Sequence, residues 1–530
     1  MKAFLMYRDR DFDPEQILAR RHQRNTAEEL GLQRLLPWNA EVLTQDLELD
    51  TLIDAMAGGD QFLSEASRSA IVSAVRQDLD TIAYRQAILA DCLKNAAIIR
   101  DMYALTIDAI EREKKKFWSW FGDSPAATLN RAVGVMGMLV EILRRLREMA
   151  DLHDDKFASD GFRRLLAMLR AELSDDYFAE VQAHLRELKF RDGVLASAEL
   201  GEAAKGNNYT LRRLQPRDRS WLKRIFTQPP PSFTLHLSPR DEAGGRALSE
   251  LHDRGIALVA NALAQSCDHV LRFLAMLRTE LAFYVGCLNL HGHLAKLDEP
   301  VCFPVAAAPG ERRFSCRELY DICLALRMGV KVVGNDVNAD GKDLMVITGA
   351  NQGGKSTFLR SVGLAQLMMQ AGMFAPAESF SASVCEGVFT HYKREEDVTM
   401  KSGKLDEELA RMSEIVDNLR GDALVLFNES FAATNEREGS EIARRIVEAL
   451  VEKRVRAFFV THLFEFAYGI YETGERNVRF LRAKREADGR RTFKLIEGEP
   501  LQTSYGEDLY NRIFAPRRQG ARSLADQVAG

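Results

Sequence analysis

The stretch from Gly349 to Ser356 constrains the fold of this 530-residue chain more than any other. It reads GANQGGKS and matches the pattern G-x-x-x-x-G-K-[ST], with the apolar run LMVIT before it and a helical pattern after it. Glycines let such a loop curl until its N–H groups face phosphate oxygens, and the next helix directs its N-terminus at the same anion. The stretch therefore predicts a nucleotide site between a strand and a helix of an α/β domain.

The chemistry of this loop assigns a role to each polar residue. Lys355 is expected to contact the β- and γ-phosphates of ATP, and Ser356 is expected to bind Mg²⁺. ATP and Mg²⁺ are therefore the expected cofactors. The predicted nucleotide-binding residues are Gly349, Ala350, Asn351, Gln352, Gly353, Gly354, Lys355, Ser356 and Thr357.

Two later apolar runs end in residues that suit hydrolysis. LVLFNES ends its apolar part at Asn428 and Glu429, and RAFFVTH ends at His462. Because ligands of α/β proteins bind at the C-terminal ends of strands, Glu429 is the candidate base for the attacking water and His462 the candidate γ-phosphate contact. Asn428 stands where many ATP-hydrolysing proteins with this loop have an aspartate that supports Mg²⁺. Its amide oxygen can accept hydrogen bonds from metal-bound water but carries no charge.

The sequence pattern changes along the chain. Residues 1–45 are mixed, and 46–300 repeat apolar residues at helical spacing, apart from a β-containing insertion at about 191–240. Strands and helices alternate over 301–514, which is typical of an α/β domain with a mostly parallel sheet, and 515–530 form a tail. The expected fold class is multidomain α and α/β: a helical domain with a small β-containing insertion, then a P-loop (ABC-type) ATPase domain.

Composition excludes several classes of protein. The formal net charge of -5 provides no global field toward nucleic acid or membrane, so any such contact must be a local patch. No run approaches 18 uninterrupted apolar residues, so no membrane span is expected. The chain has seven cysteines, an odd number, and none of them are spaced as CxxC. This pattern favours reduced thiols over a disulfide framework or a zinc site. No signal-peptide pattern opens the chain, and a cytoplasmic location is expected.

The best candidate for a nucleic-acid contact is the basic segment 205–226, KGNNYTLRRLQPRDRSWLKRIF. Tyr209 and Trp221 are interleaved with its cations, and Asp218 is its one acidic residue. Such a segment suits phosphate contacts, which position a protein on DNA without reading its bases. A solvated face and an arginine-rich internal interface remain open as alternatives. The candidate DNA-binding residues are Lys205, Arg212, Arg213, Arg217, Arg219, Lys223 and Arg224.

The chain resembles the MutS family of DNA mismatch-repair ATPases. The likeness is strong over about 320–512 and weaker over about 40–300. It rests on Asn335-Asp336 in VVGNDV and on the segments GANQGGKSTFLRSVGLAQLMMQAGMFAPA, FTHYKREEDVTMKSGKLDEELARMSEIVDNL, VTHLFEFA, TFKLIEGEPLQTSYGEDL, DLELDTLIDAM and AYRQAILADCL.

The resemblance implies an architecture and a set of partners. Residues 46–300 would be the family's helical core and lever, with its DNA-gripping clamp in the insertion, and 301–514 its ATPase domain. A homodimer would sandwich two ATP molecules and close around duplex or branched DNA, with an unknown downstream repair protein and no membrane partner. Ser402 would touch the γ-phosphate bound by the partner subunit, although a plain helix cap explains this serine equally well.

Three departures from the family pattern matter. Asn428 replaces its aspartate, and FAATNE replaces the glycine-rich turn after Glu429. Only some forty residues precede the helical core, so the N-terminal mismatch-reading domain is expected to be absent; Phe178-Ala179-Glu180 matches that domain's Phe-x-Glu motif by chance. The leading hypothesis is an ATP-driven dimeric clamp in DNA mismatch repair or related DNA repair or recombination. The alternative is a nucleotide-switched protein-interaction module with little or no hydrolysis and no mismatch recognition.

Overall fold

The computed structural model describes residues 1–12, 37–118, 124–190, 193–202, 206–213, 242–394, 403–486 and 491–501. Its internal contacts divide the chain into two compact units. We call Met1–Phe12 with Asp91–Leu281 the helical unit, and Asp13–Ala90 with Ala282–Gly530 the α/β unit. Each unit is therefore assembled from two stretches that are distant in the sequence.

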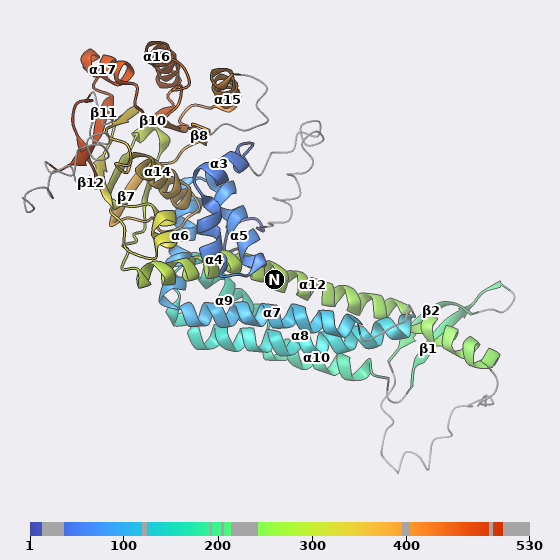
Figure 1. Ribbon diagram of the computed structural model, residues 1–530. Coiled ribbons are helices and arrows are strands. Elements are labelled where there is room, and N and C mark those ends of the chain that lie inside the picture. The colour runs from blue at the N-terminus through green and yellow to red at the C-terminus, as the bar shows by residue number, and fades with distance from the viewer. Residues whose placement is uncertain are drawn as a thin grey trace, which may run out of the picture. The chain divides into compact units, whose positions relative to one another are not determined.

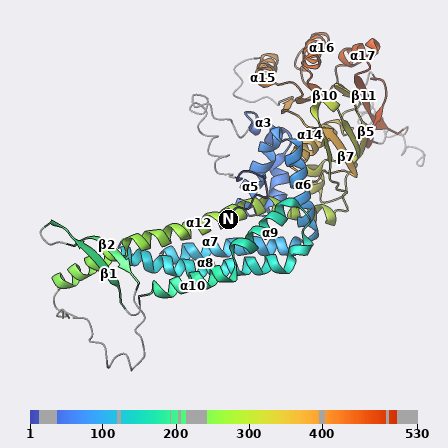
Figure 2. The same ribbon diagram turned by 180° about the vertical axis from the view of Figure 1, so that it is seen from behind.

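In its described residues, the helical unit consists of helices and one hairpin. Figures 1 and 2 show α7, α8 and α10 running side by side, with the hairpin of β1 and β2 beyond one end of them. The two strands of the hairpin pair antiparallel. The elements are α7 (Ala96–Trp118), α8 (Pro125–His153), α9 (Asp160–Glu172), α10 (Asp175–Glu187), β1 (Leu195–Leu200), β2 (Gly206–Arg212) and most of α12 (Glu242–Lys296). A β-containing insertion among helices was expected from the sequence, and this hairpin lies within it.

Helix α8 illustrates how the sequence specifies these elements. Ser124 caps its N-terminus by accepting a hydrogen bond from the Ala127 N–H at 3.2 Å, and Pro125 occupies the first helical position, where its missing N–H costs nothing. Leu139, Leu143 and Leu146 are buried at spacings of four and three residues, which places them on one face. The helix is therefore capped at its start and amphipathic along its length.

The N-terminal segment is held to α12 by a buried carboxylate. Glu280 accepts hydrogen bonds from the backbone N–H groups of Leu5 and Met6. Burial raises the pKa of Glu280 to about 7, because a charged carboxylate loses its hydration there. This contact closes the helical unit across more than 270 residues of sequence.

The α/β unit contains two sheets within its described residues. In the larger sheet the strand order is β12-β11-β6-β10-β9-β8, and all neighbours are parallel except the antiparallel pair β11–β12. Its strands are β6 (Leu344–Thr348), β8 (Val388–Tyr392), β9 (Leu424–Asn428), β10 (Arg456–Val460), β11 (Val478–Arg485) and β12 (Arg491–Glu497). The alternation of strands and helices thus gave the sheet that the sequence predicted.

The second sheet is mixed and was not foreseen from the sequence. Its order is β3-β7-β4-β5, with β3 parallel to β7 and the other pairs antiparallel. The strands are β3 (Val305–Ala307), β4 (Phe314–Leu319), β5 (Asn335–Asn338) and β7 (Ser379–Ser383). They are short and surrounded by loops, so a period-two pattern cannot be recognised in them.

Helices cover both faces of the larger sheet. Phe427 and Phe459 point to the face covered by α15 (Lys404–Asn418), α16 (Glu436–Glu452) and α17 (Phe464–Thr473), and form one hydrophobic core with them. Leu426 has the opposite parity and meets α14 (Lys355–Gln370) near Gly363. Because both faces are covered, β6 and β10 are buried at every position and read as continuous apolar runs.

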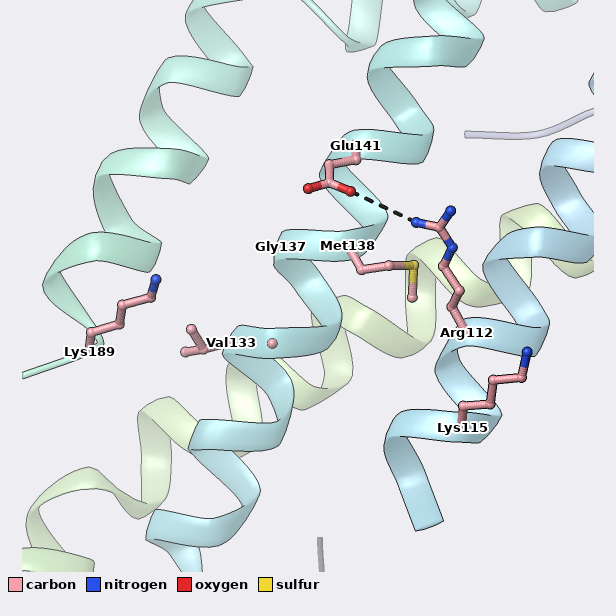
Figure 3. Close-up of a pocket in the computed structure, with 8 residues that line it drawn as sticks. Arg112, Lys115, Val133, Gly137, Met138, Glu141 and Lys189 are labelled. Atoms are coloured by element: carbon pink, nitrogen blue, oxygen red, sulfur yellow. Dashed lines mark ion pairs between the residues drawn. The ribbon is translucent and has the colours of Figure 1, made fainter. Parts of the chain in front are cut away.

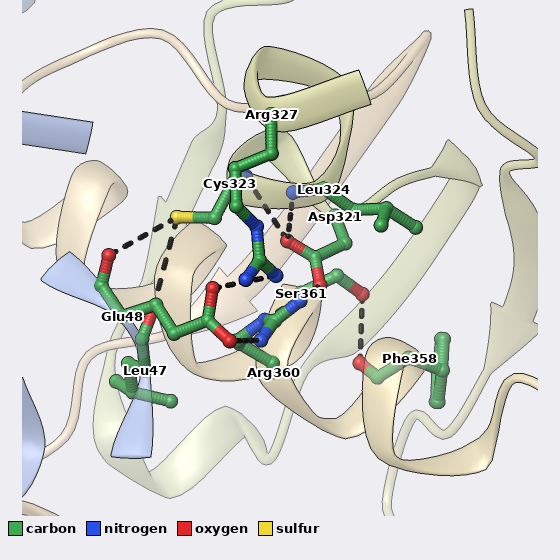
Figure 4. A network of polar contacts seen from close by, with 9 residues as sticks. All are labelled: Leu47, Glu48, Asp321, Cys323, Leu324, Arg327, Phe358, Arg360 and Ser361. Carbon is green, nitrogen blue, oxygen red and sulfur yellow. Dashed lines mark hydrogen bonds and ion pairs between the residues drawn. The ribbon is translucent and has the colours of Figure 1, made fainter. Parts of the chain in front are cut away.

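The remaining helices of this unit pack near α14, and charged side chains join two of them, α4 and α13, to it (Figure 4). They are α3 (Ala40–Asp46), α4 (Leu49–Ala57), α5 (Gln61–Val72), most of α6 (Leu79–Lys94) and α13 (Ile322–Met328). Arg360 of α14 donates to Asp321 at 2.6 Å and pairs with Glu48, which also pairs with Arg327 at 2.7 Å. Asp321 in turn caps α13 by accepting from the Cys323 N–H at 3.0 Å. Buried charges need partners of this kind, so the network sets the orientation of α14.

Two observations bear on the exclusions drawn from composition. All seven cysteines fall within described ranges and are free thiols. Pro125–Lys156 and Glu242–Lys296 are long and apolar enough to cross a membrane by length and composition alone, but 56% and 72% of their most apolar windows are buried inside the protein. Burial of this kind is typical of core helices, which pass the same test.

Candidate nucleotide-hydrolysis site

The candidate residues converge at one edge of the larger sheet. Strands β6, β10 and β9 are adjacent and parallel, with Val460 in register with both Ile347 and Asn428. Their C-terminal ends therefore meet at the same edge. The loop that begins at Gly349, the pair Asn428–Glu429 and His462 all emerge there, as α/β topology requires of a ligand site.

The segment Gly349–Gly354, here called the glycine loop, curls in a way that requires its glycines. Gly349 and Gly354 have φ values of 118° and 90°, in the left-handed range that favours glycine. A Cβ at Gly349 would lie 2.9 Å from the Ala483 backbone nitrogen, and one at Gly353 would lie 2.7 Å from the Ala483 side chain. The loop thus packs directly against β11, and any side chain at these positions would force the two apart.

A second contact braces the loop from β12. Asn335 is buried; its side-chain oxygen accepts from the Leu495 N–H at 2.7 Å, and its amide donates to the Phe493 carbonyl at 3.3 Å. The Phe493 carbonyl in turn lies 3.3 Å from where a Cβ would stand on Gly354. The resemblance drew attention to Asn335 without giving a reason. The structure supplies one, because this amide holds β12 against the glycine loop.

Lys355 is the buried cation of the site. Its ammonium group donates to the carbonyls of Gly349 and Ala350, at 2.8 and 3.0 Å. Burial lowers the pKa of Lys355 to about 8, and the nearby negative charge of Glu429 opposes that shift. An anion in the glycine loop would favour the charged form further. The first-turn N–H groups of α14 have no partner within the helix and point the same way.

Ser356 and Asn428 meet directly. The Ser356 hydroxyl donates to the Asn428 side-chain oxygen at 2.8 Å, so the amide faces the serine predicted to bind Mg²⁺. Among the described residues there is no group of three or more His, Cys, Asp or Glu side chains that could hold a metal alone. Mg²⁺ is usually held by one or two protein oxygens together with phosphates and water. Ser356, Asn428 and the adjacent Glu429 fit an ion of that kind, bound with a nucleotide.

Glu429 and His462 form the second close pair. The His462 Nε2 lies 3.2 Å from the Glu429 Oε1, and both side chains are 32% exposed. The hydrogen bond from His462 lowers the pKa of Glu429, with a smaller contribution from the Lys355 charge. The carboxylate is therefore ionised at neutral pH and able to accept a proton. Its backbone is in the left-handed region, at φ 55°, where non-glycine residues are rare and often functional.

The turn after Glu429 shows how FAATNE replaces a glycine-rich turn. Phe431 itself adopts the left-handed conformation, at φ 63°. A Cβ at Gly439 would lie 2.4 Å from the Phe431 carbonyl oxygen, so the glycine that this geometry needs comes from α16. Asn435 then caps α16 by accepting from the Glu438 N–H at 3.0 Å. The turn keeps a tight path without a glycine of its own.

Sequence reasoning missed three residues under this turn, namely His391, Glu408 and Ser430. His391 Nδ1 lies 2.7 Å from Ser430 Oγ, and the Glu408 carboxylate accepts from the Phe431 N–H at 2.8 Å. His391 lies in a segment that was noted only as a likeness to the family. The one available signal was its position next to the last residue of the strand-like run VFTHY.

Only two of the candidate DNA-binding residues, Arg212 and Arg213, lie among the described residues. Arg212 ends β2 and donates to Ser197 Oγ at 2.8 Å, and the exposed Arg213 pairs with Glu187. Both of these arginines therefore have a partner within the helical unit. The other candidates, and the signature serine, lie outside the described residues; they are Lys205, Arg217, Arg219, Lys223, Arg224 and Ser402.

The helical unit also has a groove with basic residues on its rim (Figure 3). Gly134 and Gly137 of α8 leave it open, and Lys115 and Lys189 lie on either side. Arg112 also lines it but pairs with Asp108 at 2.8 Å and approaches Glu141 at 4.0 Å. Part of the positive charge at this groove is thereby neutralised.

Comparison with known proteins matches both parts of the chain. The family model for the MutS2 N-terminal domain matches residues 77–297, and that for MutS domain V matches residues 345–526. A DNA mismatch repair protein MutS from Thermus aquaticus is 32% identical over 184 residues, covering 34% of this chain and 22% of that protein. An Endonuclease MutS2 from Geobacillus kaustophilus (strain HTA426) is 35% identical over 205 residues, or 38% of this chain and 25% of the relative.

A third relative matches this chain over a longer segment. An Endonuclease MutS2 from Lacticaseibacillus casei (strain BL23) is 31% identical over 257 residues, covering 46% of this chain and 32% of that protein. The match spans less than a third of the length of each of these three relatives. The mixed helical and α/β fold, with several sheets and a glycine loop between β6 and α14, defines a protein of MutS-like architecture. The chain belongs to the MutS family, and the resemblance seen in its sequence is confirmed.

Proposed function

We propose that this chain is a DNA-binding ATPase that acts as a nucleotide-driven dimeric clamp in DNA mismatch repair or a related repair or recombination process. The observation that carries the proposal is the Glu429–His462 pair, at 3.2 Å, on the same sheet edge as the Ser356–Asn428 contact. An ionised carboxylate beside a phosphate-binding loop is the arrangement that ATP hydrolysis needs.

The residues divide the work of hydrolysis among them. The glycine loop would surround the phosphates. Lys355 would leave the carbonyls of Gly349 and Ala350 and neutralise the charge of the phosphates. Ser356 and Asn428 would hold Mg²⁺, which when bound shields the phosphate oxygens. Glu429 would orient the attacking water and take its proton, while His462 would turn from Glu429 toward the γ-phosphate.

The proposed dimer and the proposed DNA binding are inferred from membership of the MutS family. Two subunits would enclose two ATP molecules, with Ser402 of each touching the nucleotide of the other. The ATP-bound and ATP-free arrangements would differ in how the helical units grip DNA, and the basic segment 205–226 would contact its phosphates. Thermus aquaticus MutS is named a DNA mismatch repair protein, which supports the repair setting.

The proposal is tested by measuring DNA binding and ATP turnover together. Duplex, mismatched, branched and single-stranded DNA are titrated with and without ATP at several salt concentrations. We expect DNA affinity that falls as salt rises, a change in affinity with nucleotide, and turnover without any acceptor substrate. ATP binding with neither turnover nor salt-dependent DNA binding would contradict the proposal and favour the protein-interaction module.

A further inference from the structure

The turn that carries Glu429 rests on two buried polar side chains that the proposed mechanism does not use. His391 of β8 is 1% exposed, and Ser430, the residue after Glu429, is fully buried. The His391 Nδ1 lies 2.7 Å from the Ser430 Oγ, and its Nε2 lies 3.0 Å from the backbone carbonyl oxygen of Glu408 in α15. One imidazole ring thus connects β8, α15 and the catalytic turn.

The directions of these hydrogen bonds follow from the chemistry of the partners. Burial lowers the pKa of His391 to about 4, so the ring is neutral at pH 7 and carries one proton. The Glu408 carbonyl oxygen can only accept, so that proton sits on Nε2. Nδ1 is then an acceptor, and the Ser430 hydroxyl is its donor. The same hydroxyl lies 2.6 Å from the His391 carbonyl oxygen, so its alternative acceptor belongs to the same residue.

The turn above this ring is strained on both sides of Ser430. Glu429 and Phe431 both have left-handed backbones, at φ 55° and 63°. The Glu408 carboxylate accepts from the Phe431 N–H at 2.8 Å, and the Phe431 ring stacks on His391 with centroids 5.2 Å apart. A turn with two such residues keeps its shape only when its surroundings fix it. The Glu429 N–H donates to the Val460 carbonyl at 2.9 Å, and the rest of the turn, at Ser430 and Phe431, is held by His391 and Glu408.

We infer that His391 and Ser430 are a positioning pair, which holds the Glu429 carboxylate in the orientation that meets His462. The inference rests on the proposed function, because Glu429 must be the base for its orientation to matter. Among the described residues, the Ser430 hydroxyl contacts His391 and not Glu429 or His462, so the positioning pair acts through the backbone of the turn. Its loss should affect the chemical step more than nucleotide binding.

Ser430→Ala tests the pair most simply. It removes the hydroxyl that contacts Nδ1 and is expected to slow single-turnover ATP hydrolysis by roughly ten- to a hundredfold, the usual cost of a small misplacement of a catalytic group. The dissociation constant of a fluorescent ATP analogue should stay within about twofold, because the glycine loop is untouched. Ser440→Ala is the matched control: Ser440 is also buried, and its hydroxyl meets no hydrogen-bond partner among the described residues.

Three replacements of His391 separate positioning from packing. His391→Asn keeps an acceptor near the position of Nδ1, and His391→Gln keeps a donor near Nε2. His391→Phe keeps only the ring that stacks on Phe431. We expect hydrolysis by His391→Asn to be several times faster than by the other two, with similar melting temperatures for all three. Equal losses in the three variants, or a parental rate in a folded Ser430→Ala variant, would overturn the inference.

Glu429→Gln is measured in parallel to separate the two proposals. If Glu429→Gln slows hydrolysis while Ser430→Ala does not, the positioning pair fails and the catalytic role of Glu429 stands. If Glu429→Gln hydrolyses ATP at the parental rate, both the base assignment and the inference are overturned.

Discussion

The candidate residues of the α/β unit and those of the helical unit are organised in different ways. In the α/β unit, Ser356, Asn428 and His462 come from separate segments, yet the parallel order of β6, β10 and β9 brings them to one edge. In the helical unit, Arg212 and Arg213 are neighbours in sequence but turn to different partners, Ser197 and Glu187. The C-terminal ends of adjacent parallel strands lie at the same edge of a sheet, so residues that follow them come together. Surface charges that are neighbours in sequence need not act together.

The two regions also differ in what their charges contribute. Lys355 is buried and the Arg360 side chain is 13% exposed, and each is held by partners that a substitution would leave unpaired. The Arg213–Glu187 pair is exposed, and pairs of that kind typically contribute less than about 1 kcal/mol. Arg213 is therefore free to exchange Glu187 for a phosphate at little cost. We expect substitutions in the α/β unit to act on specific steps, and those in the basic segment to act on DNA affinity as a whole.

The largest effect should come from Lys355→Ala. The site loses the buried cation that follows the glycine loop, so nucleotide binding should disappear at ATP concentrations that saturate the parent. Titration with a fluorescent ATP analogue measures this. Lys331→Ala, which removes an exposed lysine paired with Asp298, is the control for loss of a positive charge. Parental ATP affinity in Lys355→Ala would show that the loop does not hold phosphate.

Neutralising Arg212, Arg213, Arg217 and Arg219 together tests the basic segment. DNA affinity should fall by about tenfold or more at 0.1 M salt, similarly for all sequences, and its salt dependence should flatten because fewer counterions are released. ATP turnover without DNA should not change. Neutralising four exposed arginines elsewhere in the helical unit provides the control; Arg145, Arg163, Arg186 and Arg254 are suitable. Equal losses in the two variants would remove the special role of the segment.

A smaller, opposite effect is expected of Asn428→Asp. The new carboxylate is nearly isosteric and faces Ser356, so it should attract Mg²⁺ in a partly desolvated site. The Mg²⁺ midpoint of the ATPase should move to lower concentration by a few-fold, with equal or faster turnover. Asn435→Asp, at the cap of α16, is the matched control because Asn and Asp cap helices equally well. An unmoved midpoint with lower stability would mean that Asn428 is a structural residue only.

The smallest effect concerns stability in the helical unit. The pKa of Glu280 is about 7 in the folded protein and 4.5 without the protein environment, so the folded state retains a proton that the unfolded state releases. Stability should therefore decrease as pH rises from about 4.5 to about 7. Glu280→Gln stays neutral and should keep that stability, a difference on the order of 3 kcal/mol at pH 8. Urea unfolding at pH 5 and pH 8 measures it, with exposed Glu148→Gln as the control. Equal pH dependence in parent and Glu280→Gln would contradict this reading.

The sequence predicted the parts of the site that topology determines. Motif spacing and strand order led to the glycine loop and to the candidate residues at the ends of the strands. The direct contacts of Asn428 with Ser356 and of His462 with Glu429 were not predicted. What it did not predict depends on residues far apart in the chain. Arg360 meets Glu48 across 312 positions, and Asn335 meets Leu495 across 160. No local pattern encodes such pairs. Gly439 and Phe431 are close in sequence, but their close approach depends on the left-handed backbone at Phe431, which no sequence pattern revealed.

Single-turnover hydrolysis by Glu429→Gln tests the central claim most directly. The claim is that Glu429, set beside His462 at the sheet edge, takes the proton of the attacking water. We predict that hydrolysis slows by roughly a hundredfold or more while ATP affinity is retained, because the amide cannot accept that proton but preserves the shape of the site. Hydrolysis at the parental rate by a folded, ATP-binding Glu429→Gln variant would contradict the account.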